Sequence, residues 1–184
     1  MRADDYYMNF AYLSERWLFE YMDKTFSDSD DEEILEQLAD EKKHTRMTLG
    51  ALSKVIDVPI HDTNISIEKA IYEDIGGWKI DKETFSALSW IVERRALFLY
   101  KMYMKKGKDP YYRKITNAIL DDERKHIGFH DEEITDKHLE IKAIDKAIWL
   151  KAHEVYGQNA MFELPFWEDL FDGKLKEKLN VELP

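Results

Sequence analysis

The chain contains the stretch Asp40-Glu41-Lys42-Lys43-His44 and, further on, the closely similar Asp122-Glu123-Arg124-Lys125-His126. Each copy places a glutamate and a histidine three residues apart, within a stretch that is predicted to be helical. Side chains at that spacing project from the same face of an α-helix. A carboxylate and an imidazole on one face provide half of a metal site. The two copies therefore predict a dinuclear metal centre inside a helix bundle.

Composition excludes several classes of function. The 184 residues carry a formal net charge of -11, which argues against nucleic-acid binding through a basic surface. The chain has no cysteine, so any metal must be held by histidine and carboxylate side chains. No apolar run approaches the roughly 20 residues of a membrane span. We therefore expect a soluble, cytoplasmic protein without a nucleic-acid or membrane partner.

Scarcity of glycine and proline, with seven and four residues, predicts a chain that is nearly all helix. Ser29 and Glu32 form a capping-box signature, and Asp109-Pro110 supplies an N-cap with a first-turn proline. The apolar residues of the C-terminal tail should pack back on the bundle. The expected helices cover residues 4–26, a second helix that ends near 55, 81–106, 110–135 and 139–156.

The loops between these helices predict how the helices are connected. Short loops after the first and third helices make antiparallel hairpins. Residues 56–80 must then form a long crossover between the hairpins, which is the connection of a ferritin-like four-helix bundle. We expect residues 1–184 to form a single domain of this kind, in which residues 139–184 add a fifth helix and a packed tail.

Two further glutamates lie level with the repeated motifs. In an antiparallel hairpin, residues equally far from the turn lie side by side. Glu15 and Glu41 are each about 13 residues from the first turn, and Glu93 and Glu123 are each about 15 residues from the second. Glu20 lies well off that level, so Glu15 is preferred over it.

The resulting candidate site contains four carboxylates and two imidazoles. Such hard oxygen ligands with a few nitrogens suit two iron ions, or one manganese and one iron. Without metal, four buried carboxylates would repel one another and lose their hydration. A single Glu-x-x-His pair on a charged helix more often faces solvent, but here it occurs twice and apolar residues precede each glutamate at helical spacing. The predicted ligands are Glu15, Glu41, His44, Glu93, Glu123 and His126.

Other residues near the motifs leave alternatives open. Asp40 and Asp122 either orient a ligand histidine across the bundle or are solvated acids beside lysine. His130 is favoured as an ordinary half-buried histidine over a third ligand. For Tyr100, core filling is favoured over a redox or hydrogen-bonding role. Nothing in the sequence requires His153 or Glu163 to reach the site.

The order Glu, Glu-x-x-His, Glu, Glu-x-x-His on successive helices, over roughly residues 8–135, resembles the ferritin-like di-iron carboxylate superfamily. Within it, residues 109–116 together with 122–126 are similar to the fourth-helix region of aldehyde-deformylating oxygenases and of the phenylacetyl-CoA epoxidase branch. The resemblance implies a di-iron oxygenase or oxidase that activates dioxygen to oxidise a small organic substrate. It also implies an external electron donor, because no flavin or iron–sulfur motif is visible.

The main alternative is an iron-handling protein, either a ferritin-like ferroxidase or a rubrerythrin-like peroxide scavenger. The lack of cysteine removes the rubredoxin module of rubrerythrins, and the large aromatic tail argues against a ferritin storage cage. A helical interaction subunit without enzymatic activity is a third alternative. The sequence does not name the substrate or the reductant, does not distinguish Fe/Fe from Mn/Fe, and leaves a homodimer open.

Overall fold

The computed structural model describes residues 2–56, 81–131, 135–156 and 164–173, and all regular structure in these residues is α-helical. The all-α prediction is therefore confirmed for the described residues. None of the described helices combines the length and the apolar composition that crossing a bilayer requires. The helices are α1 (Ala3–Phe26), α2 (Glu32–Ala51), α4 (Lys82–Lys106), α5 (Pro110–Asp131), α6 (Asp136–Tyr156) and α7 (Leu164–Phe171).

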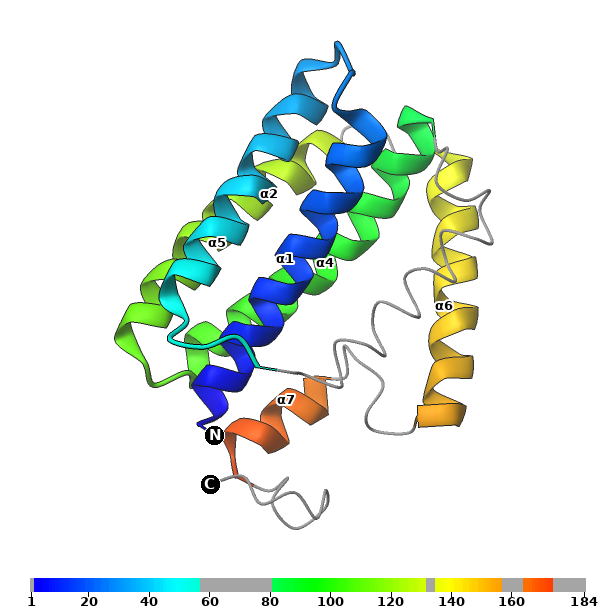
Figure 1. Ribbon diagram of the computed structural model, residues 1–184. Helices are drawn as coiled ribbons and strands as arrows, with labels where there is room; N and C mark the ends of the chain where they lie inside the picture. The colour runs from blue at the N-terminus through cyan, green and yellow to red at the C-terminus, as the bar shows by residue number, and fades with distance from the viewer. Residues whose placement is uncertain (1, 57–80, 132–134, 157–163, 174–184) are drawn as a thin grey trace.

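Four of the helices pack as two hairpin pairs. α1 packs against α2 and α4 against α5, and contacts between α2 and α5 join the two pairs (Figure 1). The end of α2 and the start of α4 lie at opposite ends of the bundle, as a long crossover requires. The crossover itself lies almost wholly in residues 57–80, outside the described residues. The ferritin-like connection and the single-domain boundaries therefore stay predictions.

Local signals fix the helix starts, with one correction. The N-cap of α2 is Asp31 rather than the predicted Ser29, because its carboxylate accepts from the backbone N–H groups of Glu33 and Ile34. The Ser29 hydroxyl accepts from the N–H of Asp31 instead. Asp109 caps α5 as predicted, since its Oδ1 accepts from the N–H groups of the second and third residues of that helix.

Two other boundaries differ from the expected ones. α2 ends at Ala51 rather than near residue 55, because Leu52 is extended with ψ 130°. α5 is described as far as Asp131, and residues 132–134 before its predicted end near 135 lie outside the described residues. α6 begins at Asp136 instead of 139, where the His138 ring accepts a hydrogen bond from the N–H of Thr135 just before the helix. These shifts fall at helix ends and leave the inward-facing residues on their helices.

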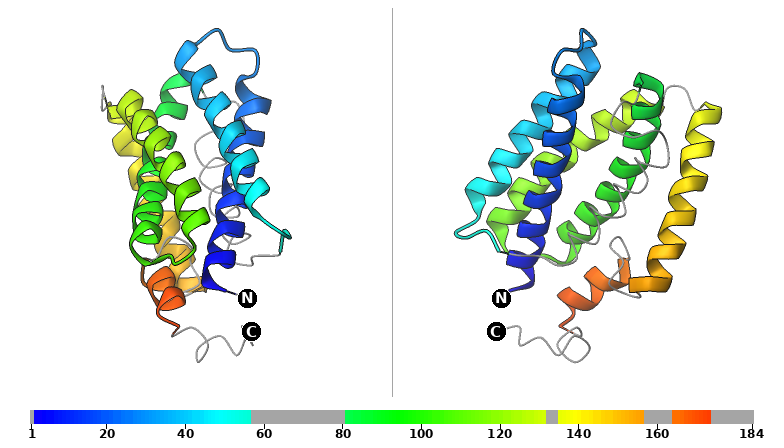
Figure 2. Two further views of the ribbon diagram at one scale, coloured as in Figure 1. Left: turned by 90° about the vertical axis from the view of Figure 1, so that its left-hand side faces the viewer. Right: turned by 45° about the vertical axis from the view of Figure 1, so that its right-hand side comes forward.

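The apolar core consists of two clusters, one toward each end of the bundle. The first contains Tyr7 and Tyr103 together with Trp167 of α7, so this part of the tail packs back as expected. The second contains Met22 and Leu88 and is completed by Ile141 of α6, which packs along α4 outside the bundle (Figure 2). Along α1 and α4, the residues between these clusters include the predicted glutamates.

Candidate metal centre

The six predicted ligands converge in the interior of the bundle. Each helix of the two hairpins contributes its predicted glutamate, and α2 and α5 each add a histidine one turn later. All six side chains are at most 4% exposed. Glu20, the alternative to Glu15, instead pairs with Arg16 at the surface, where its side chain is 59% exposed. The use of the six predicted side chains as metal ligands remains a prediction, but the structure brings all six together.

One half of the cluster surrounds the ring of His44. Its Nδ1 lies 3.2 Å from Oε2 of Glu15, 3.8 Å from Oε2 of Glu41 and 3.6 Å from Oε1 of Glu123. One atom from each of these four residues lies within 4.8 Å of the others. Such a group is small enough to hold a single cation.

The other half surrounds the ring of His126 in the same way. Its Nδ1 lies 3.4 Å from Oε2 of Glu93, 3.7 Å from Oε1 of Glu41 and 3.5 Å from Oε2 of Glu123. Glu41 and Glu123 thus belong to both halves, each offering one oxygen to each histidine. The arrangement suits two cations that share these two carboxylates.

Buried carboxylate oxygens without hydrogen bonds fit a metal site. Neither oxygen of Glu41 receives a hydrogen bond from any described residue, and the same holds for Oε2 of Glu93. Buried polar atoms nearly always have a partner, and an orphaned one is costly. Hard cations such as iron or manganese would supply the missing partner. This set of carboxylate and imidazole donors therefore fits the predicted metal.

Electrostatics lead to the same conclusion. Burial, together with the charges of Glu123 and Glu15, raises the pKa of Glu41 to about 8. Burial and Glu123 likewise raise the pKa of Glu93. Burial alone would lower the pKa of both histidines, but their carboxylate neighbours raise it to about 12. Protons thus offset part of the negative charge when no metal is bound, and cations would take over that role.

One aspartate contacts the far side of each imidazole. Nε2 of His44 lies 3.2 Å from Oδ2 of Asp122 on α5, and Nε2 of His126 lies 3.4 Å from Oδ2 of Asp40 on α2. Each aspartate therefore contacts the histidine of the other hairpin. Such contacts leave Nδ1 of each ring facing the cluster. Lys43 bridges the two aspartates, at 2.9 Å from Asp40 and 2.5 Å from Asp122, which disfavours a third cation there.

Replacing Asp122 with asparagine is expected to weaken metal binding about 10- to 100-fold, because the His44 ring loses its anionic partner. Chelator competition with Fe(II) or Mn(II) measures this change. Asp121→Asn is the matched control, since that neighbouring carboxylate is exposed and pairs with Arg124. Equal affinities for the two variants would contradict the orienting role of Asp122.

Of two polar contacts to the site, one was not predicted from the sequence, and the other was considered less favoured than core filling. Gln37 donates from Nε2 to Oε1 of Glu93, and Tyr100 donates its hydroxyl to Oε1 of Glu15. The only signal for Gln37 is its place one turn before Glu41 on the inward face of α2. Tyr100 does fill the core, but the preference for core filling alone was wrong. Each of the glutamates outside the repeated motifs thus has one oxygen fixed and one facing the histidine.

A pocket between α1 and α4 reaches the site. It spans about 550 Å³ of empty space when the open solvent at its mouth is included, and it is lined mainly by apolar side chains such as Phe10 and Leu99. Half-buried residues, among them Trp17 and Ala96, form part of its lining. Its lining also includes Glu15, Glu93 and Glu123. The pocket therefore extends from the gap between the side chains of α1 and α4 to three of the predicted ligands.

The other candidates of the sequence lie outside what the structure describes. The side chains of His130 and His153 are not among the described ones, and Glu163 falls in residues 157–163. Comparisons with protein-family models, with curated proteins and with solved structures find no match. The resemblance to the ferritin-like superfamily thus remains an interpretation of the ligand pattern. What the structure shows is a helical bundle with buried Glu/His groups able to hold metal ions.

Proposed function

We propose that this protein is a di-iron, or manganese–iron, oxidoreductase that activates dioxygen to oxidise a small apolar organic molecule. The observation that carries the proposal is the apolar pocket whose lining includes three of the six predicted ligands. A site that only oxidised and stored iron would need an ion path, for which polar or acidic lining is the expected chemistry. The pocket lining away from the cluster instead favours a neutral organic molecule.

Each cation would have one histidine and three carboxylates around it. Glu15 and His44 would hold one cation, Glu93 and His126 the other, and Glu41 and Glu123 would contact both. When bound, two such ions supply dioxygen binding and redox chemistry that no side chain of this chain provides.

The protein's own residues set the conditions for that chemistry. Gln37 and Tyr100 hold one oxygen of Glu93 and of Glu15, so that the second oxygen of each is directed to the cluster. The apolar lining of the pocket would favour an organic molecule over water at the face where such a molecule would enter. Phe10 and Leu99 would contact such a molecule, and Ser14 offers one hydroxyl for a polar substituent.

A substitution that fills the pocket distinguishes an oxygenase from a ferroxidase. Ala96→Phe should leave metal binding intact but weaken binding of the neutral fluorescent probe N-phenyl-1-naphthylamine by more than about tenfold, or 1.4 kcal/mol. Ala143→Phe, on the exposed side of α6, is the matched control. The Fe(II)-loaded proteins are then exposed to ¹⁸O₂ with indole, toluene and octanal, and labelled products are sought by mass spectrometry.

The outcomes of this experiment discriminate between the candidate functions. A labelled organic product from the wild type, lost in Ala96→Phe, supports the oxygenase. Iron oxidation at equal rates in both variants, without any organic product, favours the ferroxidase. Failure of the wild type to bind iron or manganese contradicts both.

A further inference from the structure

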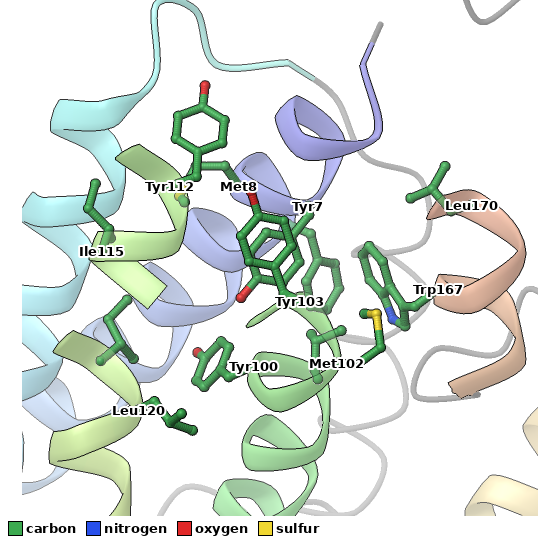
Figure 3. Packing of buried hydrophobic residues seen from close by; sticks show 13 residues of the cluster. Tyr7, Met8, Tyr100, Met102, Tyr103, Tyr112, Ile115, Leu120, Trp167 and Leu170 are labelled. Carbon is green, nitrogen blue, oxygen red and sulfur yellow. The ribbon is translucent and has the colours of Figure 1, made fainter. Parts of the chain in front are cut away.

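An unusual pair of stacked aromatic rings lies in the same core cluster as Tyr100, whose hydroxyl contacts the predicted ligand Glu15. Tyr7 of α1 and Tyr103 of α4 lie face to face, with ring centroids 3.7 Å apart and an interplanar angle of 3° (Figure 3). Both rings are fully buried. Packing alone favours offset or edge-to-face rings over direct overlap. Packing alone therefore does not account for the close overlap of these two oxidisable phenols.

Further aromatic residues lie on both sides of the stacked pair. Toward the cluster lies Tyr100, one helical turn before Tyr103 and in the same buried cluster, with its hydroxyl on Glu15. Toward the surface, the Trp167 ring meets Tyr7 edge-on at 6.1 Å, and Tyr6 lies 6.1 Å beyond it. Tyr6 is half-buried and so reaches solvent. Oxidisable rings in contact thus run from Tyr103 through Tyr7 and Trp167 to Tyr6 at the surface. Tyr100, one turn from Tyr103, contacts the predicted ligand Glu15.

The two stacked tyrosines differ in the partners that the described residues offer their hydroxyls. The Tyr103 hydroxyl donates to Oδ1 of Asp4 at 2.8 Å, whereas the Tyr7 hydroxyl contacts the hydroxyl of Thr116 at 3.3 Å and no described carboxylate. Burial raises the pKa of both tyrosines well above the usual value, so both remain neutral. A neutral phenol gives up an electron readily only if its proton leaves with it. Asp4 provides that acceptor for Tyr103.

We propose that Tyr103, stacked on Tyr7 and hydrogen-bonded to Asp4, is a one-electron donor to the metal centre, refilled from the surface through Trp167 and Tyr6. This inference rests on the proposed function. Reduction of dioxygen to water takes four electrons; bound Fe(II) ions would supply two of them and an organic substrate the other two. When the pocket is empty, Tyr103 supplies one electron at a time and its proton moves to Asp4. A solvent reductant such as ascorbate then returns the electron, and the proton moves back.

The first test uses the metal-loaded protein. Fe(II)-loaded protein is mixed with dioxygen in the absence of organic compounds and ascorbate, freeze-quenched and analysed by electron paramagnetic resonance. A tyrosyl radical signal is expected, to be lost in Tyr103→Phe, which keeps the ring but removes the hydroxyl, and in Asp4→Asn. Tyr21→Phe is the control, because that tyrosine is buried in the other core cluster. An unchanged signal in Tyr103→Phe, or no signal although the iron is oxidised, would overturn the relay.

A second test needs no metal and so separates this inference from the proposed function. Metal-free protein is illuminated with tris(bipyridine)ruthenium(II) and persulfate, which oxidise accessible aromatic side chains from solvent. Deuterium labelling of tyrosine rings identifies the radical signal, which we expect to include a component that disappears in Tyr103→Phe. Identical spectra for wild type and Tyr103→Phe would refute the relay. Failure to bind metal in the first test would count against the proposed function alone.

Discussion

Replacing Glu41 with alanine is expected to abolish the binding of both metal ions, from about two per chain to near zero. Glu41 contributes an oxygen to each half of the cluster, and neither oxygen is used by a described hydrogen-bond donor. Removing it therefore takes one carboxylate ligand from both cations at once. Each cation is then left with less negative charge around it to offset its positive charge. Metal analysis after expression in iron-rich medium, together with anaerobic Fe(II) titration, measures the change.

Glu36→Ala is the matched control for this experiment, because Glu36 lies on the same helix but is exposed. The control should retain the metal content of the wild type. A wild type that contains almost no metal, unchanged by Glu41→Ala, would remove the basis for both the oxygenase and the ferroxidase. Loss of one ion alone would show that Glu41 serves only one half of the cluster.

A substitution at the same position should stabilise the metal-free protein. Glu41→Gln is expected to raise the free energy of unfolding at pH 7 by on the order of 3 kcal/mol, because burial and neighbouring carboxylates disfavour the ionised form. Urea denaturation of chelator-treated protein measures this difference. His44 retains Glu15 and Asp122 as partners, each at 3.2 Å, so the substitution does not leave its charge unpaired.

The pH dependence gives this prediction its sign. The pKa of Glu41 is raised from 4.5 to about 8 in the folded protein, so the folded state binds more protons than the unfolded state between these values. Wild-type stability should therefore fall relative to Glu41→Gln as the pH rises from about 4.5 to about 8, by up to roughly 1.4 kcal/mol per pH unit. Below pH 4.5 the two proteins should differ little. A pH-independent difference would point to packing rather than ionisation.

Much of the site could be predicted from the sequence because its signals are local. The spacing of Glu41 and His44, and of Glu123 and His126, fixes a shared face on one helix regardless of the rest of the chain. Equal distances from a turn placed Glu15 and Glu93 level with them. Helix ends were less predictable. Ser29 and Asp31 are both good caps, and only the backbone path decided for Asp31.

The remaining contacts depend on which helices become neighbours. Asp122 and His44 come from different hairpins, as do Asp40 and His126, and no pattern within either hairpin encodes such pairs. The contact of Gln37 with Glu93 likewise joins α2 to α4. These contacts fix the orientation of side chains that the sequence had already indicated as candidate ligands.

The sequence by itself determined the helical class and the six candidate ligands, because helix periodicity and turn length act over a few residues. Only the tertiary structure decided that an apolar pocket opens between α1 and α4 beside Glu15, and that Trp167 of α7 closes over the Tyr7–Tyr103 stack. Both features arise where side chains distant in sequence meet, and their shapes follow from the packing of whole helices rather than from any local pattern.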